Sequence, residues 1–498
     1  MKSSIALVAF SVGALSSFGV VVPMPRTMTL DVGSIAAKDA RIVCAKGKGL
    51  SPEGYRLTVT TNGVEIAAAD DAGEFYARET LRQLLTDGRY PCCRIDDAPA
   101  YRWRGMMIDE ARHFLGKDTV KRVIDLMAMH KLNVLHWHLT DDQGWRVELK
   151  RHPELVEFGA VRPESVRMGG WRKWEKGGPV FETDGMRYGP CFHSQADIRE
   201  ILAYAKARHV TVVPEIEFPG HVRALLAAYP RCSCVGEKLP RTPRVFWGIE
   251  SDVLCVGNDE AVALAEDILD EVCDLFPDAP YIHIGGDECP RTRWEACPKC
   301  RARMAGEGLK DASALQSWLT TRLARHLEKK GRRAVGWDEV LAGDVPKTTV
   351  GMSWRSTAKD GAGTGYVSAA EAVARGYDMV VTPMRSCYLS LPSGAAHDPY
   401  FYYSPKMRLT LADAYTFDPA RGIPPELRAH ILGGQASVWG EFVWTRFDLE
   451  WKTWPRACAI AEALWTAPAE RDFAAFRRRM EAHRARLLDA HVNCGPLD

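Results

Sequence analysis

The chain has 498 residues, of which 46% are hydrophobic, so it exceeds one small domain and can bury a large core. Lys and Arg number 65 and Asp and Glu number 64, which gives a formal net charge of +1. This balance gives no electrostatic basis for binding nucleic acid or an anionic membrane, so a neutral ligand fits better. The 15 tryptophans are numerous, and indole faces suit ligand rings as well as core packing.

The first residues have the form of a secretory signal. Lys2 precedes an apolar run over residues 5–15, and the small residues Ser16 and Ser17 follow it. The run is too short for a stable anchor, and no other stretch approaches the roughly 18 apolar residues of a membrane span. We therefore expect a signal peptide over residues 1–20 and an exported protein, periplasmic or secreted.

Clustered cysteines allow two interpretations. Among the 14 cysteines there are three close pairs: Cys92-Cys93, Cys232-x-Cys234 and Cys297-x-x-Cys300. In an exported protein the first interpretation is disulfides, which we favour. A Cys-x-x-Cys can also be half of a zinc site, with Cys232, Cys234 or Cys289 as candidate partners. No second Cys-x-x-Cys lies at the usual spacing, so the sequence leaves the choice open.

Residues 21–99 have the pattern of a small α/β domain. Two alternating stretches, residues 55–60 and 64–68, flank the turn Asn62-Gly63 and predict a β-hairpin. A helical pattern over residues 72–85 follows. Nothing here clusters polar side chains, so we interpret this domain as scaffold.

Beyond it, short apolar strands alternate with helical stretches, which is typical of βα units and a parallel sheet. The eight candidate strands are residues 105–108, 134–137, 211–214, 281–284, 333–336, 350–353, 379–382 and 431–434. They predict a (β/α)₈ TIM barrel over residues 100–470, preceded by the small α/β domain. Residues 471–498 are expected to form a C-terminal helix packed on the barrel.

Helical patterns separate several of these strands. Residues 119–130, 196–207 and 260–276 each carry apolar positions at a helical spacing. Asp118 is expected to cap the first of these helices.

A barrel enzyme carries its chemistry at the carboxyl ends of the strands. After the strand at 281–284, Gly285-Gly286 lets the chain turn, so the neighbouring carboxylates of Asp287 and Glu288 can serve one pocket. Polar or aromatic residues follow all eight strands, and this recurrence indicates a functional site. In chain order these residues include Arg112, Asp141, His221, Asp287, Glu288, Trp337, Trp354, Tyr388, Trp439 and Glu441.

Carboxylates, tryptophans and one arginine together suit a neutral sugar. Indoles stack on the ring, Arg and Glu bind hydroxyls, and an acid protonates the glycosidic oxygen. A metal site is the alternative, but it would want three or four Asp, Glu or His at separate strand ends without a wall of tryptophan. The tryptophans after the fifth, sixth and eighth strands favour the sugar.

Four longer motifs occur in order along the chain. They are Asp109-Glu110-Ala111-Arg112-His113-Phe114, residues 136–145 (HWHLTDDQGW), residues 213–221 (VPEIEFPGH) and His283-Ile284-Gly285-Gly286-Asp287-Glu288. These motifs resemble those of the family-20 glycoside hydrolases, the exo-acting β-N-acetylhexosaminidases. The resemblance covers nearly the whole chain after the signal segment, and residues 55–85 resemble the small domain that precedes the barrel in that family.

The resemblance implies retaining, substrate-assisted hydrolysis of a terminal N-acetylglucosamine or N-acetylgalactosamine. By this likeness Glu288 is the general acid and then the base, and Asp287 orients the 2-acetamido group. The acetamido oxygen is the nucleophile and gives an oxazolinium intermediate. No cofactor and no metal are expected at the site.

The resemblance also implies roles for the other predicted residues. Tyr388 matches the tyrosine that hydrogen-bonds the acetamido oxygen. The remaining matches are Trp337, Trp354 and Trp439 around the acetamido methyl and the sugar ring, Arg112 and Glu441 at the outer hydroxyls, and Asp141 and His221 in a network beside the acid.

One position departs from the family pattern. The family usually has an acidic residue two positions after the tyrosine, and here that residue is Ser390. Either Ser390 faces the sugar and changes recognition at its 4- and 6-positions, or Asp398 on the nearby loop replaces the missing carboxylate. An enzyme that releases a disaccharide or a modified sugar is therefore one alternative function.

A sugar-binding protein without catalysis is the other alternative, against which the retained Asp287, Glu288 and Tyr388 argue. The sequence does not indicate an oligomeric state.

Overall fold

The computed structural model describes residues 20–175, 178–357, 359–360, 365–394 and 407–497. The chain divides into two compact units. One contains the chain up to residue 99 together with residues 469–492, and the other contains residues 100–468 with 493–496. The predicted signal peptide lies, apart from residue 20, outside the described residues.

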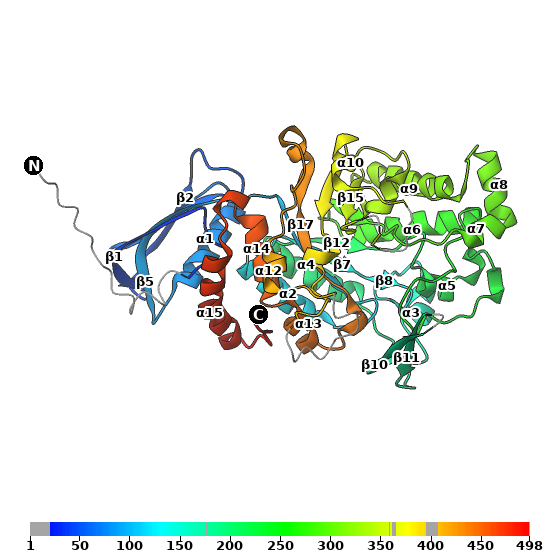
Figure 1. The fold of residues 1–498 in the computed structure, drawn as a ribbon, viewed down its shortest axis with the longest axis horizontal. Coiled ribbons are helices and arrows are strands. Elements are labelled where there is room, and N and C mark those ends of the chain that lie inside the picture. Colours follow the sequence, from blue (N-terminus) through cyan, green and yellow to red (C-terminus); the bar gives the residue numbers. More distant parts are fainter. Residues whose placement is uncertain (1–19, 176–177, 358, 361–364, 395–406, 498) are drawn as a thin grey trace, which may run out of the picture. The chain divides into compact units, whose positions relative to one another are not determined.

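The N-terminal unit contains a five-stranded sheet with the order β1-β5-β3-β4-β2 (Figure 1). The predicted hairpin is confirmed, because β3 and β4 pair antiparallel from Tyr55↔Ala68 to Thr60↔Gly63. Alternate residues of β3 are buried, as expected for a strand with one face on the core. The elements are β1 (Thr27–Ala36), β2 (Ile42–Lys46), β3 (Tyr55–Thr60), β4 (Gly63–Ala68), α1 (Asp71–Leu84) and β5 (Arg89–Asp97).

The C-terminal helix α15 (Phe473–Asp489) belongs to the N-terminal unit, and its predicted packing on the barrel stays a prediction. In that unit, Arg486 Nη2 donates to the carbonyl oxygen of Gln83 at 2.6 Å. The buried positions Phe476, Met480 and Leu487 give α15 one apolar face. Such a face shows that a helix packs against something, but its sequence does not select the surface.

The second unit is a closed barrel of eight parallel strands, which confirms the predicted TIM fold. It closes where β17 pairs with β6, from Gly433↔Trp103 to Val438↔Ile108. Both faces of β6, β7, β15 and β17 are buried, and for this reason the strands read as continuous apolar runs. The barrel strands are β6 (Trp103–Asp109), β7 (Val134–His138), β12 (Thr211–Glu215), β13 (Tyr281–His283), β14 (Arg333–Trp337), β15 (Val350–Ser353), β16 (Asp378–Val381) and β17 (Ile431–Val438).

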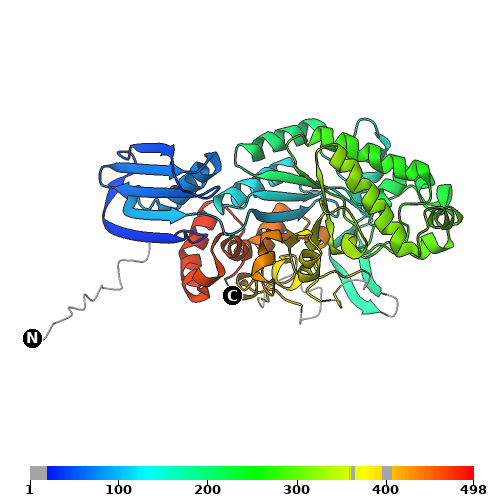
Figure 2. The same ribbon diagram turned by 90° about the horizontal axis from the view of Figure 1, so that it is seen from above.

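Long helices lie outside these strands (Figure 2). The predicted helices correspond to α2 (Lys117–Met129), α4 (Gln195–Lys206) and α6 (Asp259–Leu275). Asp118 is not the cap of α2, because Gly116 occupies that position and Asp118 lies within the first turn. Its charge there still favours the helix N-terminus.

The remaining helices and strands lie mostly in the loops between barrel strands. They are β8 (Thr140–Asp141), β9 (Gly144–Trp145), α3 (Glu154–Gly159), β10 (Val166–Glu175), β11 (Gly178–Thr183), α5 (Arg223–Ala228), α7 (Thr292–Ala296), α8 (Pro298–Gly306), α9 (Ala312–Lys329), α10 (Ala369–Ala374), α11 (Met384–Cys387), α12 (Leu411–Tyr415), α13 (Arg446–Thr453) and α14 (Arg456–Trp465).

Two sequence expectations concern the whole chain. Within the described ranges, no helix has both the length and the apolar character needed to cross a membrane. The disulfide expectation is wrong, because none of the six cysteines in the three close pairs forms a disulfide among the described residues. Cys92 and Cys93 illustrate the reason, since neighbouring residues of β5 point to opposite faces and both are buried.

Candidate active site

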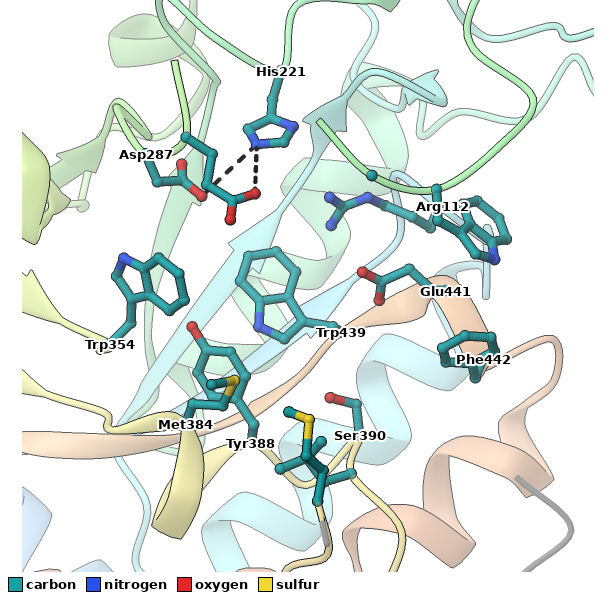
Figure 3. A pocket seen from close by; sticks show the side chains of 15 residues that line it. Arg112, His221, Asp287, Trp354, Met384, Tyr388, Ser390, Trp439, Glu441 and Phe442 are labelled. Carbon is teal, nitrogen blue, oxygen red and sulfur yellow. Dashed lines mark ion pairs between the residues drawn. The ribbon is translucent and has the colours of Figure 1, made fainter. Parts of the chain in front are cut away.

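A cavity of about 240 Å³ lies among the residues that follow the barrel strands (Figure 3). The predicted residues that line this cavity follow six different barrel strands, and no strand contributes more than two of them. Barrel geometry requires this distribution. The described residues that line the cavity are Arg112, His221, Trp247, Gly248, Asp287, Glu288, Trp354, Met384, Tyr388, Ser390, Leu391, Met407, Trp439, Glu441 and Phe442.

The two adjacent carboxylates are placed by a sharp turn after β13. Gly285 has φ +64°, and a Cβ atom there would collide with Glu217 Oε2. Glu288 itself has φ +43°, a left-handed conformation that is uncommon for a residue with a side chain. The turn brings both carboxylates to one cavity, with side chains 13% exposed for Asp287 and 24% exposed for Glu288.

His221 lies against both carboxylates. Its Nε2 is 3.9 Å from Asp287 Oδ2 and 3.8 Å from Glu288 Oε2. Its Nδ1 is 3.4 Å from Asp141 Oδ1 and 3.2 Å from Asp142 Oδ2. Burial alone would lower the pKa of His221, but the carboxylate of Asp141 and the hydrogen bonds to the acidic groups raise it well above its usual value. A positive imidazolium therefore faces the carboxylate pair.

Asp287 is the more buried member of that pair. Burial raises the pKa of Asp287 to about 7, while the charge of His221 opposes this shift and that of Glu288 adds to it. Asp287 Oδ1 is buried and has no hydrogen-bond partner among the described residues. Because a buried acceptor without a partner is costly, this oxygen is suited to receive an N–H or O–H group of a ligand.

Arg112 lies at another side of the cavity. Its Nη1 is 2.9 Å from Asp109 Oδ2 and its Nη2 is 2.7 Å from Asp141 Oδ2. Burial disfavours the guanidinium charge, but these carboxylates and Glu441 raise the pKa of Arg112 well above its usual value. Burial raises the pKa of Glu441, and Arg112 acts in the opposite direction. The guanidinium also lies 5.1 Å from the ring centroid of Trp439.

Three aromatic side chains form a wall of the cavity. Trp354 and Tyr388 are stacked with ring centroids 6.4 Å apart and planes 12° apart. Tyr388 and Trp439 lie 5.9 Å apart with planes at 59°. Trp354 Nε1 donates to Glu339 Oε2 at 3.1 Å, which fixes its indole plane. Figure 3 shows the hydroxyl of Tyr388 directed toward the end of the pocket where Trp354 and Asp287 lie.

Eight of the ten predicted site residues line the cavity, while Asp141 and Trp337 lie behind the lining. Trp337 is fully buried, its ring centroid is 5.6 Å from that of Trp439, and its Nε1 donates to Glu215 Oε1 at 2.9 Å. Asp141 is buried between Arg112 and His221. Trp337, which was predicted beside the sugar ring, thus contacts Trp439 and does not reach the cavity, whereas Asp141 was predicted only as part of a network beside the acid.

Other lining residues were missed from the sequence. Trp247 belongs to the long segment between β12 and α6, far from any strand end, so no periodic signal points to it. Phe442 follows Glu441 directly and could have been included. Ser390 lines the cavity. Asp398, its candidate replacement, lies outside the described residues.

Comparison with known families identifies this arrangement. A family model described as glycosyl hydrolase family 20, catalytic domain, matches residues 101–468. The model of domain 2 of the same family matches residues 20–98. The chain belongs to glycosyl hydrolase family 20. It is thus a glycoside hydrolase by family. The predicted small domain and the predicted barrel each correspond to a domain of that family.

Relatives within family 20 support the assignment. A β-hexosaminidase of Porphyromonas gingivalis is 38% identical over 461 residues, which are 89% of this chain and 54% of that protein. A β-hexosaminidase of Akkermansia muciniphila is 33% identical over 444 residues, which are 88% of this chain and 84% of that protein. The chain therefore spans about half the length of the first relative and most of the second.

Solved structures agree with the barrel and the preceding small domain. A β-N-acetylhexosaminidase crystal structure matches with a TM-score of 0.84 at 31% identity, covering 94% of this chain and 95% of that one. An exo-β-N-acetylglucosaminidase of Vibrio harveyi, solved in complex with N-acetylglucosamine, matches with a TM-score of 0.81 at 29% identity. That match covers 99% of this chain and 81% of the Vibrio chain.

Replacing Arg112 by Met tests the buried ion pairs of the family-20 site. Asp109 and Asp141 would lose their shared counter-ion while remaining buried, so we expect a loss of about 3–5 kcal/mol in unfolding free energy. Urea unfolding followed by tryptophan fluorescence measures the change.

Arg322→Met is the matched control, because Arg322 pairs with Glu266 at 2.8 Å while its side chain is 42% exposed. An exposed pair contributes about 1 kcal/mol or less. Equal losses in the two variants would show that the Arg112 network is no more than a surface ion pair in energy.

Proposed function

We propose that the protein is an exo-acting β-N-acetylhexosaminidase that removes a terminal, non-reducing, β-linked N-acetylglucosamine or N-acetylgalactosamine. The observation that carries this proposal is the placement of Asp287 and Glu288 against one imidazole, that of His221, with Asp287 Oδ1 lacking a hydrogen-bond partner among the described residues. One carboxyl group can then give a proton to the leaving group while the other accepts a hydrogen bond from an N–H of the substrate.

This geometry favours a nucleophile that belongs to the substrate. A retaining enzyme with a protein nucleophile has its two carboxyl groups flanking the scissile bond, roughly 5–5.5 Å apart. Here both carboxylates belong to adjacent residues and approach the same atom, His221 Nε2, at 3.9 and 3.8 Å, so our proposal does not place them on opposite faces of the sugar. The 2-acetamido oxygen of the sugar supplies the nucleophile in our proposal, which the family resemblance also implies.

The proposed reaction has two steps. Glu288 gives its proton to the glycosidic oxygen while the acetamido oxygen bonds to the anomeric carbon, and the leaving alcohol departs. Glu288 then takes a proton from water as that water attacks the anomeric carbon, which opens the oxazolinium ion and retains the configuration. Asp287 accepts the acetamide N–H throughout and stabilises the positive charge on that nitrogen.

Tyr388 completes the acetamido site in this proposal. Burial raises the pKa of Tyr388 well above its usual value, so its hydroxyl keeps its proton and can donate to the acetamido oxygen. Trp354 and Trp439 enclose the methyl group and the ring. Trp337 holds Trp439 from behind and does not contact the sugar itself.

The size of the cavity supports action at chain ends. Its volume of about 240 Å³ lies below the roughly 300–1,000 Å³ of sites for drug-sized ligands, so it suits one sugar residue. Arg112 and Glu441 lie where the outer hydroxyls of that residue would bind. The Vibrio harveyi neighbour, named as an exo-acting enzyme and solved in complex with N-acetylglucosamine, is consistent with this view.

A preference for substituted sugars is a second candidate, favoured by Ser390. This residue lines the cavity beside the apolar side chains of Leu391, Met407 and Phe442, where the family usually has a carboxylate. A neutral side chain leaves room and removes repulsion toward an anionic group at the 4- or 6-position.

We also propose that the enzyme is exported, on the basis of the signal pattern in residues 1–20. Signal cleavage detected by N-terminal sequencing of protein from a native host would test this proposal.

Replacing Glu288 by Gln removes the proton but preserves the shape of the side chain. Hydrolysis of substrates with poor leaving groups should fall by roughly 10²–10⁴-fold, and an activated aryl glycoside should lose much less, since its leaving group needs less protonation. Steady-state kinetics on the two substrate types measures the difference.

Glu295→Gln, an exposed change on α7, should leave both rates unchanged. Equal losses on both substrates in Glu288→Gln would contradict its role as the acid.

The acetamido group should be required for turnover. Aryl β-glucosides that lack it should be nearly inert, and a thiazoline analogue of the intermediate should inhibit with a Ki far below the KM of the substrate. Mass spectrometry of the protein trapped with a fluorinated glycoside provides the opposing test. A sugar bound covalently to any carboxylate of the chain would rule out the substrate-assisted mechanism.

Replacing Ser390 by Asp should restore the usual carboxylate at this position. A charge-assisted hydrogen bond of about 1.5–3 kcal/mol predicts roughly a tenfold or greater rise in selectivity for plain over 6-sulfated N-acetylglucosaminides. The ratio of kcat/KM values on the two substrates is the measurement, with Ser386→Asp as a control outside the cavity lining.

Asp398→Ala separates the two explanations of Ser390. Unchanged selectivity in Ser390→Asp, together with loss of activity on plain substrates in Asp398→Ala, would favour replacement by Asp398 over tolerance of substituted sugars.

A further inference from the structure

Four cysteine side chains meet at one point in the catalytic unit, outside the substrate cavity. They are Cys234, Cys255, Cys297 and Cys300, whose sulfur atoms all lie within 4.8 Å of one another. The first comes from the segment after β12, the second from the loop before α6, and the last two from the start of α8. Residues more than 60 positions apart in the sequence are thus brought together by the fold.

The spacing of the sulfur atoms distinguishes a metal site from disulfides. The measured distances are 3.8 Å between Cys234 and Cys300, 3.8 Å between Cys255 and Cys297, and 3.7 Å between Cys255 and Cys300. A disulfide would bring two sulfurs to about 2.05 Å. A tetrahedron of thiolates around zinc, with Zn–S bonds of about 2.3 Å, has edges of about 3.75 Å. The observed distances agree with the tetrahedron.

The backbone around the cluster favours thiolates. Cys297 is the N-cap residue of α8, a helix of nine residues, and Cys300 lies in its first turn. The positive end of the helix dipole stabilises negative charge at these positions. The N–H group of Gly257 also donates to Cys300 Sγ at 3.4 Å. A Cβ atom on Gly257 would collide with the backbone nitrogen of Cys300, so the close approach requires glycine.

We infer that Cys234, Cys255, Cys297 and Cys300 bind a structural zinc ion through four thiolates. Soft thiolate ligands in a tetrahedral arrangement select zinc over calcium, magnesium or manganese. Four protein ligands leave no open position for a substrate, which is typical of a structural rather than a catalytic zinc site. The sequence suggested Cys232, Cys234 or Cys289 as partners of the Cys-x-x-Cys pair. Of these three, only Cys234 belongs to the cluster.

The position of the cluster indicates what the metal stabilises. Cys234 and Cys255 close the base of the segment that carries Trp247 to the cavity. Leu254, next to Cys255, donates its N–H to the carbonyl of Pro219, two residues before His221. Trp294 lies in α7, the helix between the Glu288 loop and Cys297. Its Nε1 donates to the Leu254 carbonyl oxygen at a distance of 2.8 Å. Zinc therefore cross-links the segments that hold Trp247, His221 and Glu288 in the active site.

Metal analysis of the full chain tests the inference without relying on enzymatic activity. Protein purified without chelators should contain about one zinc ion per chain by plasma mass spectrometry. An organomercurial reagent that binds thiols should release this zinc stoichiometrically. Protein without metal, whether the four cysteines are oxidised to disulfides or free, would overturn the inference, as would iron in place of zinc.

Cys→Ser variants locate the ligands. Cys297→Ser and Cys300→Ser should lose most of the bound zinc, whereas Cys232→Ser, a change at a buried cysteine outside the cluster, should retain the wild-type content. Loss of zinc in Cys232→Ser with retention in Cys300→Ser would refute the ligand assignment.

A spectroscopic measurement does not depend on how well these variants fold. The wild-type protein exchanged with Co²⁺ should show thiolate-to-cobalt charge-transfer bands and the visible absorption of tetrahedral cobalt. Cobalt uptake without thiolate charge-transfer bands would overturn the four-thiolate site.

Discussion

The buried carboxylate of Asp141 is the interaction on which the rest of the active site depends. Its oxygens lie 2.7 Å from Arg112 Nη2, 3.0 Å from His138 Nε2 and 3.4 Å from His221 Nδ1. Basic and acidic groups thus alternate along one series: Arg112, the two acidic partners of His221, His221 itself and the pair Asp287-Glu288. A buried charge without partners costs several kcal/mol, so Arg112, Asp141 and His221 require one another to keep their ionised forms. The pair of carboxylates at the cavity is the exposed end of this series.

The barrel could be predicted because its strands have little freedom in composition. A parallel strand covered on both faces must be apolar throughout, and it must end where polar loops begin. All eight strands of the barrel overlap the predicted ranges, and the residues after them include the carboxylates and most of the aromatic wall. The sequence of the C-terminal helix is less informative for the opposite reason, because one apolar face can pack on any apolar surface.

The depth of each side chain in the site could not be predicted. Trp337 and Trp439 both occur at strand ends. Trp439 lines the cavity, whereas Trp337 lies behind the lining and donates its N–H to Glu215. The difference depends on the direction of the backbone where each strand ends, since Trp337 is the last residue of β14 while Trp439 follows β17. Trp247 was missed because a long loop carries no periodic pattern.

Long loops are also the part of a barrel that the sheet does not hold. Strand pairing fixes where a loop begins and ends, but loop segments between those points need contacts of their own. The loop after β16 is held by Arg456, whose guanidinium donates to the carbonyl oxygens of Leu389 and Leu391 at 2.7 and 2.8 Å. The segment after β12 has only short helices, and the four-cysteine cluster lies at its base. A buried cation fulfils the same requirement in both loops: a guanidinium joins backbone carbonyls in one, and zinc joins thiolates in the other.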